Sequence, residues 1–317
     1  MKFSFKDPSR EIHVLSILNH GRCLICNHKF DEGEKYYSGV SNDGTSIIAC
    51  EKCKTEIKAL FKEYVFYEKE FLVPDLNIKL WRYQDFAKFV SLLESKKLYF
   101  PRADSFDDPF EGARGFNFQK DAIYYRTKEY LRLSIHSECL SKRIILSDNE
   151  LENKISSKLD EIIIEQENKR KRYYISCWHE NDRESEGMWK LYTTALNQGV
   201  AIQTTMERLC SSLDDDSFEI GNVKYISFDE PLDDDKIPIW YKRDAFAHER
   251  EVRVVICNPT SVSSGLLVNV DLDTLIERIY VSPAAPKWLA ELVESVIKTY
   301  SIDKPVEYSQ LNNTPIY

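Results

Sequence analysis

The sequence contains little glycine and lacks the short motifs that mark the commonest nucleotide-binding and hydrolytic sites. Glycine accounts for only 10 of the 317 residues. No Walker loop, G-x-G-x-x-G, H-E-x-x-H or G-x-S-x-G pattern occurs. A loop that cradles phosphate depends on glycine for close backbone approach. Such a loop is therefore excluded, together with the usual cofactor and nucleophile-elbow chemistries.

Long apolar runs are also missing. No stretch is long and apolar enough for a transmembrane helix, and the N-terminal stretch has no signal-peptide core. We therefore expect no membrane partner and a cytoplasmic location. The net charge of −9 argues against a general nucleic-acid coat, although a local basic patch could still bind phosphate. With 43% apolar and 30% charged residues, the composition is that of a globular protein.

Four of the eight cysteines form two C-x-x-C pairs, which are the most specific local signal in the chain. Zinc binds four thiolates at tetrahedral angles, and each pair can supply two of them: Cys23, Cys26, Cys50 and Cys53. Asn42-Asp43-Gly44 predicts a hairpin turn between the pairs, and a helix follows the second pair. This order resembles a treble-clef zinc finger over about residues 12–65, within an N-terminal domain at 1–70. The finger could contact nucleic acid or serve only to stabilise the fold, because its basic residues are matched by acidic ones.

From about residue 76 to 317 the pattern predicts one α+β domain with a mixed, mainly antiparallel sheet and flanking helices. A charged helical insertion is expected at about 119–172, with its charges facing water. Expected strands begin near residues 78, 98, 173, 199, 219, 247, 265, 276 and 305, and expected helices near residues 86, 184, 206 and 286.

The stretch AFAHEREVRVVIC, residues 245–257, combines an apolar strand with a charged beginning. Because successive strand side chains point to opposite faces, Glu249, Glu251 and Arg253 are expected to share one face. Such a row is either a solvated ladder of ion pairs or a functional site.

Other polar and aromatic residues recur where the expected strands begin or end. Ser176 and Trp178 should share one strand face, whereas Cys177 is interpreted as a buried thiol. The remaining members of this set are Arg82, Tyr83, Asp107, Asp108, Glu111, Trp189, Tyr192 and Lys242.

Residues 78–310 resemble a bacterial family, the domain of unknown function numbered 2971. The resemblance is carried by DDPFEG, SCWHEN followed by MWKLY and GVAI, and EREVR. That family is similar to abortive-infection phage-resistance proteins. The resemblance therefore implies a role in bacterial defence, and with it a protein partner from a defence system.

A second resemblance is to the ADP-ribosyltransferase fold, which implies NAD as substrate. By this resemblance Arg82 stands on the first strand, Ser176 on the second, and Glu251 with Glu249 on a later one. A fixed carboxylate would stabilise the oxocarbenium character that develops when the nicotinamide–ribose bond breaks. Arg82 would hold the pyrophosphate, so that Arg82, Ser176 and Glu251 should converge on one cleft. The cofactor-binding set would be Arg82, Tyr83, Trp178, Trp189, Tyr192 and Arg253.

Two other functions stay open. A magnesium-dependent nuclease would use Lys242 with a carboxylate set formed by Asp107, Asp108, Glu111, Glu249 and Glu251. A non-enzymatic sensor would instead bind a partner through the charged strand face.

Overall fold

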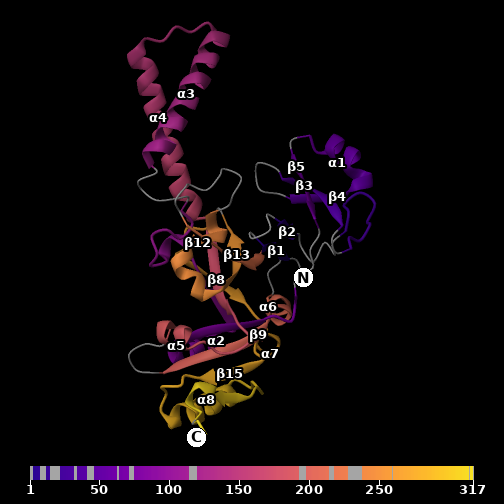
Figure 1. Ribbon diagram of the computed structural model, residues 1–317, viewed down its shortest axis with the longest axis vertical. Coiled ribbons are helices and arrows are strands. Elements are labelled where there is room, and N and C mark those ends of the chain that lie inside the picture. Colours follow the sequence, from indigo (N-terminus) through magenta and orange to yellow (C-terminus); the bar gives the residue numbers. More distant parts are fainter. Residues whose placement is uncertain are drawn as a thin grey trace.

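The structure is a computed structural model (Figure 1). The residues it describes are 3–7, 12–14, 22–31, 34–40, 46–62, 64–70, 75–113, 120–192, 198–213, 218–227, 238–258, 260–313 and 315–316. The expected turn at Asn42-Asp43-Gly44 lies outside these residues.

A nine-stranded mixed sheet forms the centre of the molecule, which confirms the α+β prediction. Most neighbouring strands run antiparallel, and only the β1–β10 and β15–β16 pairs are parallel. In spatial order the strands are β16 (Val306–Tyr308), β15 (Arg278–Val281), β9 (Gly199–Thr205), β6 (Lys79–Asp85), β8 (Tyr173–Glu180), β13 (Glu251–Cys257), β10 (Phe218–Asn222), β1 (Phe3–Asp7) and β2 (Ile12–Val14).

The sheet opens between β6 and β8. These two strands pair only where Leu80 faces Glu180 and Trp81 faces His179. Beyond that point β6 continues along β9, while β8 continues along β13. One side of the opening is therefore formed by β6 and β9, and the other side by β8 and β13.

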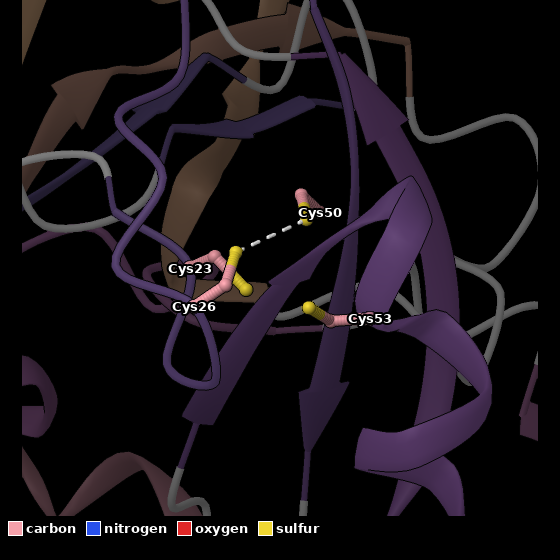
Figure 2. A group of neighbouring side chains, drawn as sticks. All are labelled: Cys23, Cys26, Cys50 and Cys53. Carbon is pink, nitrogen blue, oxygen red and sulfur yellow. Dashed lines mark hydrogen bonds between the residues drawn. The ribbon is translucent and has the colours of Figure 1, made fainter.

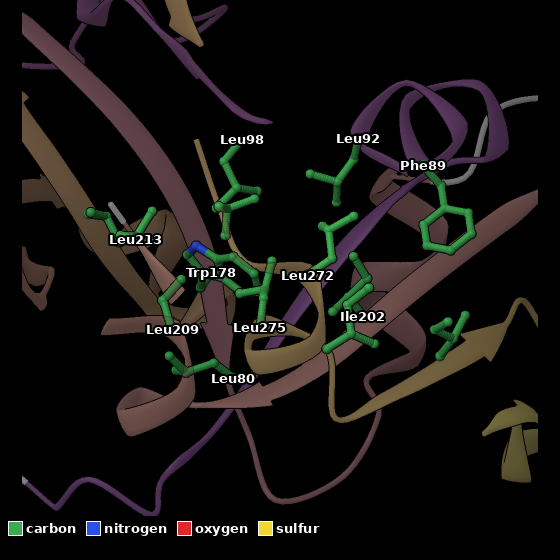
Figure 3. Close-up of a cluster of buried hydrophobic side chains, with 14 of the residues drawn as sticks. Leu80, Phe89, Leu92, Leu98, Trp178, Ile202, Leu209, Leu213, Leu272 and Leu275 are labelled. Atoms are coloured by element: carbon green, nitrogen blue, oxygen red, sulfur yellow. The ribbon is translucent and has the colours of Figure 1, made fainter. Parts of the chain in front are cut away.

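One face of the sheet carries the main hydrophobic core (Figure 3). Trp178 and Ile202 from the sheet pack there against Phe89, Leu209 and Leu275 from helices. Apolar residues at helical spacing bury one side of each helix. The helices are α2 (Phe86–Ser95), α6 (Met206–Ser212), α7 (Leu272–Leu275) and α8 (Lys287–Thr299). A short pair of strands adds to this layer, namely β7 (Lys97–Pro101) and β14 (Gly265–Asn269).

The opposite face is covered by two smaller clusters. An aromatic cluster joins Trp81 and Tyr83 to Trp189 of α5 (Glu186–Tyr192). A second cluster joins Val255 of the sheet to Trp240. It is completed by β11 (Lys224–Ile226), β12 (Tyr241–Arg243) and the 3-10 helices η3 (Ala103–Ser105) and η5 (Pro238–Trp240). The 3-10 helix η6 (Asp244–Glu249) lies against β11 and β12.

The N-terminal cysteines lie beside a separate three-stranded sheet of order β4-β3-β5, and Cys50 is the last residue of one of its strands. It contains β3 (Lys35–Val40), β4 (Ser46–Cys50) and β5 (Val65–Glu70), with η2 (Glu51–Cys53) and α1 (Lys54–Leu60) after β4. In contrast, β1 and β2 pair within the large sheet, although both lie inside the stretch 1–70 that the sequence assigns to the finger. The division at residues 70 and 76 stays a prediction.

The charged insertion is an antiparallel helical hairpin that projects from the sheet (Figure 1). It consists of α3 (Lys120–Lys142) and α4 (Asp148–Arg170). Ser147 and Glu150 form a capping box that begins α4. Among the described residues, no helix has both the length and the apolar character needed to cross a bilayer. The last helix that the structure describes is the 3-10 helix η7 (Gln310–Asn312).

Candidate functional site

The four predicted metal ligands come together in the small sheet (Figure 2). All four sulfur atoms lie within 4.8 Å of one another, and the Sγ atoms of Cys26 and Cys50 are 3.6 Å apart. Tetrahedral Zn–S bonds of about 2.3 Å place sulfur atoms roughly 3.8 Å apart. The thiols are therefore spaced as a tetrahedral metal requires.

The backbone around the first pair fixes this geometry. The N–H of Cys23 donates to the carbonyl of His28 (2.7 Å), and Asn27 adopts a left-handed conformation with φ of 60°. Burial raises the pKa of Cys23, but hydrogen bonds from backbone N–H groups outweigh it and lower the pKa to about 7. His28 contacts Glu34 (2.7 Å) and is not one of the clustered ligands. A preformed knuckle of this kind suits a metal.

A second polar cluster surrounds Arg253, in the middle of β13. Its guanidinium contacts both oxygens of Glu251 (2.7 and 3.0 Å) and both oxygens of Glu111 (2.5 and 2.9 Å). It also donates to the carbonyl of Ile239 (2.5 Å). The exposed fractions are 0% for Arg253, 1% for Glu111 and 4% for Glu251. The charged strand face is therefore buried, which excludes a solvated ladder.

Lys242 joins a further carboxylate to this cluster. Its ammonium donates to Glu249 (2.5 Å) and to Glu251 (3.3 Å). The expectation that Glu249, Glu251 and Arg253 lie on one strand is wrong for Glu249. That residue belongs to η6, and Arg250 then adopts a left-handed conformation with φ of 40° before β13 begins. This turn places Glu249 next to the cluster, where Lys242 binds both Glu249 and Glu251.

The charges in this cluster set its protonation states. Burial by itself raises the pKa of Glu251, but the cations Arg253 and Lys242 outweigh it and bring the pKa down to about 2. Burial by itself lowers the pKa of Lys242. The carboxylates of Glu251 and Glu249 outweigh this effect, so the net shift of the pKa is upward. Glu251 is thus an ionised carboxylate throughout the neutral range, although it is almost fully buried.

His179 is a member of this site that the sequence does not single out. It lies directly opposite Glu251 in the β8–β13 register. Its Nδ1 is 2.6 Å from the carbonyl oxygen of Glu249. A carbonyl only accepts, so Nδ1 carries the hydrogen and Nε2 is the acceptor. Burial lowers the pKa of His179, which keeps the ring neutral. Nε2 is buried and has no hydrogen-bond partner among the described residues.

Cys177 and Tyr192 also lie near this cluster. The half-buried Cys177 faces Arg253 across the strands, and its thiol hydrogen-bonds to Glu251. Burial raises the pKa of Cys177, so it stays a thiol and not a nucleophilic thiolate. Tyr192, at the end of α5, is 43% exposed, and its partial burial raises its pKa. This side of the site reaches the surface.

The predicted convergence of Arg82, Ser176 and Glu251 does not occur. Arg82 does meet Ser176, with 2.5 Å between the guanidinium and the hydroxyl. However, Ser176 lies opposite Val254 in the register, whereas Glu251 lies opposite His179. Strand side chains alternate, so Glu251 points to the other face of the sheet. Arg82, on β6, therefore reaches across the opening to Ser176 on β8. It also donates to the carbonyl of Tyr99 (3.4 Å).

The predicted aromatic set is mostly packed into the fold. Trp178 is 2% exposed within the main core, where its indole N–H donates to Ser176 (3.2 Å). Tyr83 and Trp189 are 5% and 2% exposed, with ring centroids 4.9 Å apart. These three rings serve packing, whereas Tyr192 faces solvent beside Glu251.

The nuclease carboxylates are not arranged around a common metal position. Asp108 binds Arg243 (2.8 Å), and Glu111 binds Arg253. Asp107 is exposed and lies outside the cluster. Among the described residues, the cysteine cluster alone brings together three or more metal-ligating side chains. Asp108 and Glu111 are each bound to an arginine and do not meet at a common magnesium position.

Comparisons with known proteins add little to this geometry. No protein-family model matches the chain, so the resemblance to the domain of unknown function 2971 stays a prediction. No curated protein matches either. Among solved structures, one described as Thermus sp. 2.9 DarT in complex with NAD+ is similar with 8% identity and a TM-score of 0.34. The match covers 76% of this chain and 99% of that chain, and a likeness this distant carries no argument.

Proposed function

We propose that the cluster around Glu251 is the active centre of an enzyme that breaks the nicotinamide–ribose bond of NAD and releases or transfers ADP-ribose. The observation that carries the proposal is a nearly buried carboxylate held in place by Arg253 and Lys242. Departure of nicotinamide leaves positive charge on the ribose, and a fixed anion in a dry site stabilises it. Arg253 and Lys242 bind the Glu251 carboxylate and fix its position. The carboxylate therefore does not have to reorient as the charge on the ribose develops.

His179 supplies the second part of the site. Its Nε2 is an acceptor that the described residues leave unused, on the residue that pairs with Glu251 across the strands. Ribose hydroxyls donate hydrogen bonds, so Nε2 can accept one from the sugar and fix its orientation. Tyr192 at the surface offers an aromatic wall for a planar base. Arg82 and Ser176 lie on the other sheet face, and the proposal gives them no part in bond cleavage.

The direct test is nicotinamide release from NAD by the purified chain. Glu251→Gln removes the anion and keeps the shape, so release should fall about 100-fold or more. Release that persists in this variant would refute Glu251 as the catalytic carboxylate.

We propose zinc as the metal of the cysteine cluster, supported by the four-thiol set and its spacing. Purified protein should contain about one zinc ion per chain, and Cys50→Ser should lose it together with the fold of the small sheet. A full-length protein that contains no zinc, and whose stability a strong chelator leaves unchanged, would contradict this.

The acceptor of ADP-ribose and the biological setting follow from the sequence resemblances alone. We propose a nucleic acid delivered by the finger, or a protein, as acceptor, and phage defence as the setting. Label transfer from radiolabelled NAD to DNA, RNA or protein separates these acceptors. If the label reaches only free ADP-ribose, the chain is a hydrolase.

A further inference from the structure

The guanidinium of Arg253 connects Glu251 to a second buried carboxylate, that of Glu111. Nε and Nη2 of Arg253 donate to Glu251 (2.7 and 3.0 Å), and Nη1 and Nη2 donate to Glu111 (2.5 and 2.9 Å). Nη1 also donates to the carbonyl of Ile239 (2.5 Å). Every N–H donor of the guanidinium therefore has an acceptor, which fixes the plane of the group. Glu111 and Ile239 thus orient the edge of Arg253 that binds Glu251.

Glu111 is not needed to balance the charges of this cluster. Arg253 binds Glu251, and Lys242 binds both Glu251 and Glu249. The two cations therefore have two carboxylate partners without Glu111. Burying a further carboxylate, only 1% exposed, costs free energy. Its bidentate contact with Arg253 indicates a role in orientation.

Glu111 lies in a segment between η3 and α3, the clamp segment, residues 108–112. Two arginines outside the cluster hold this segment. Asp108 binds Arg243 of β12 (2.8 Å). The carbonyl of Pro109 accepts from Arg170 (3.2 Å), the last residue of α4.

The base of the helical hairpin also packs on the backbone directly after Glu111. Gly112 adopts a left-handed conformation with φ of 70°, which glycine tolerates without strain. A Cβ at this position would lie 3.4 Å from Cγ of Arg170 and 3.6 Å from Cδ1 of Ile239. The stem of Arg170 and the residue whose carbonyl binds Arg253 therefore meet at the same glycine.

The helical hairpin gives Arg170 a defined position, because it has an interior of its own (Figure 1). Ile135 of α3 packs there with Ile155 and Leu159 of α4. Helix α4 ends at Arg170, and β8 begins at Tyr173. Arg170 is thus fixed between the hairpin and the central sheet.

We propose that Glu111 is a positioning residue for the Glu251 carboxylate, and that Arg170 at the base of the helical hairpin holds Glu111 in place. The role rests on the function proposed above, because it concerns the same carboxylate. Loss of Arg170 should displace the clamp segment and loosen the contact of Glu111 with Arg253. A carboxylate that stabilises developing charge has to be preoriented, and a displacement of about 1 Å can reduce a rate about 100-fold.

The first measurement follows Arg253 itself and needs no activity. Its Nε–H is buried against Glu251, so isotope-labelled arginine should give a slowly exchanging NMR signal, assigned through its loss in Arg253→Lys. Glu111→Gln and Arg170→Met should each shift this signal and speed its hydrogen exchange at least about tenfold. Arg170→Met alone decides the test if the buried Glu111→Gln does not fold.

The matched control is Arg102→Met in the full-length chain. Arg102 is also half-buried and precedes the clamp segment, but its carboxylate partner is Asp104 (2.6 Å), which does not reach Arg253. This variant should leave the Arg253 signal unchanged.

The second measurement is nicotinamide release, with rates compared well below the unfolding temperature of each variant. Arg170→Met should lower kcat at least about threefold and leave KM within about twofold, because no contact with NAD is lost. Arg170→Lys keeps a donor for the Pro109 carbonyl and should restore kcat. A purely structural role would lower the unfolding temperature and leave kcat of the folded protein unchanged.

An Arg253 signal that Arg170→Met leaves unchanged would overturn the proposal, as would equal effects of Arg170→Met and Arg102→Met. An active enzyme whose kcat does not respond to Arg170→Met would also overturn it. If the wild type releases no nicotinamide but the Arg253 signal responds as expected, the proposed function fails, whereas the positioning of Glu251 through Glu111 stands.

Discussion

Replacement of Arg253 by methionine is the sharpest test of how the Glu251 site is built. The guanidinium is fully buried between Glu111 and Glu251, which are 1% and 4% exposed. Removing one partner of a buried ion pair costs about 3–5 kcal/mol. In Arg253→Met, Glu111 would lose its arginine partner and Glu251 would keep only Lys242. We expect the free energy of unfolding of Arg253→Met to fall by about 4 kcal/mol at pH 7, a large share of the typical total.

The control is an ion pair at the surface. Arg278 pairs with Glu307, but their side chains are 45% and 30% exposed. Surface pairs contribute less than about 1 kcal/mol, so Arg278→Met should change the stability only slightly. Urea unfolding followed by tryptophan fluorescence measures both variants, because Trp81, Trp178 and Trp189 are buried in the folded state.

The dependence on pH identifies the carboxylate responsible. Glu251 titrates at about 2 in the folded state and near its ordinary value of 4.5 when unfolded. A lowered folded pKa stabilises the protein above the unfolded value, and this contribution is lost as the pH falls from about 5 towards 2. The gap between wild type and Arg253→Met should therefore be smaller at pH 3 than at pH 7. A gap below about 1 kcal/mol at pH 7 would refute the buried cluster.

Two further variants separate catalysis from packing. Ser176→Ala should release nicotinamide within about threefold of wild type, because Ser176 points away from Glu251; a loss as large as that of Glu251→Gln would show that the two sheet faces are misassigned. His179→Asn keeps a donor for the Glu249 carbonyl but removes the Nε2 acceptor, whereas His179→Gln keeps an acceptor near Nε2. We expect the glutamine variant to bind NAD more tightly than the asparagine variant in calorimetry, whereas the reverse order would mean that His179 acts only through Glu249.

Features fixed by short-range spacing could be predicted from the sequence. The two C-x-x-C pairs place four sulfur atoms around one point because each turn sets its own ligand geometry. Ser176 and Trp178 share a face because strand side chains alternate, and Glu251 and Arg253 share one for the same reason.

Relations between separate strands could not be predicted in this way. Each strand shows which of its residues share a face, but the register between strands decides whether Ser176 or His179 lies beside Glu251. Glu249 was misplaced because the left-handed turn at Arg250 has no glycine to mark it. His179 could have been found by pairing the two strands and asking which residue faces Glu251.

The central claim is that Glu251 is the anion that stabilises cleavage of the nicotinamide–ribose bond. The measurement that tests it most directly is the rate of nicotinamide release from NAD by wild type and by Glu251→Gln, with equal folding verified by circular dichroism. We predict release by the wild type and a loss of about 100-fold or more in the variant. Equal rates, or no release by the wild type with DNA, RNA and protein acceptors present, would contradict the claim.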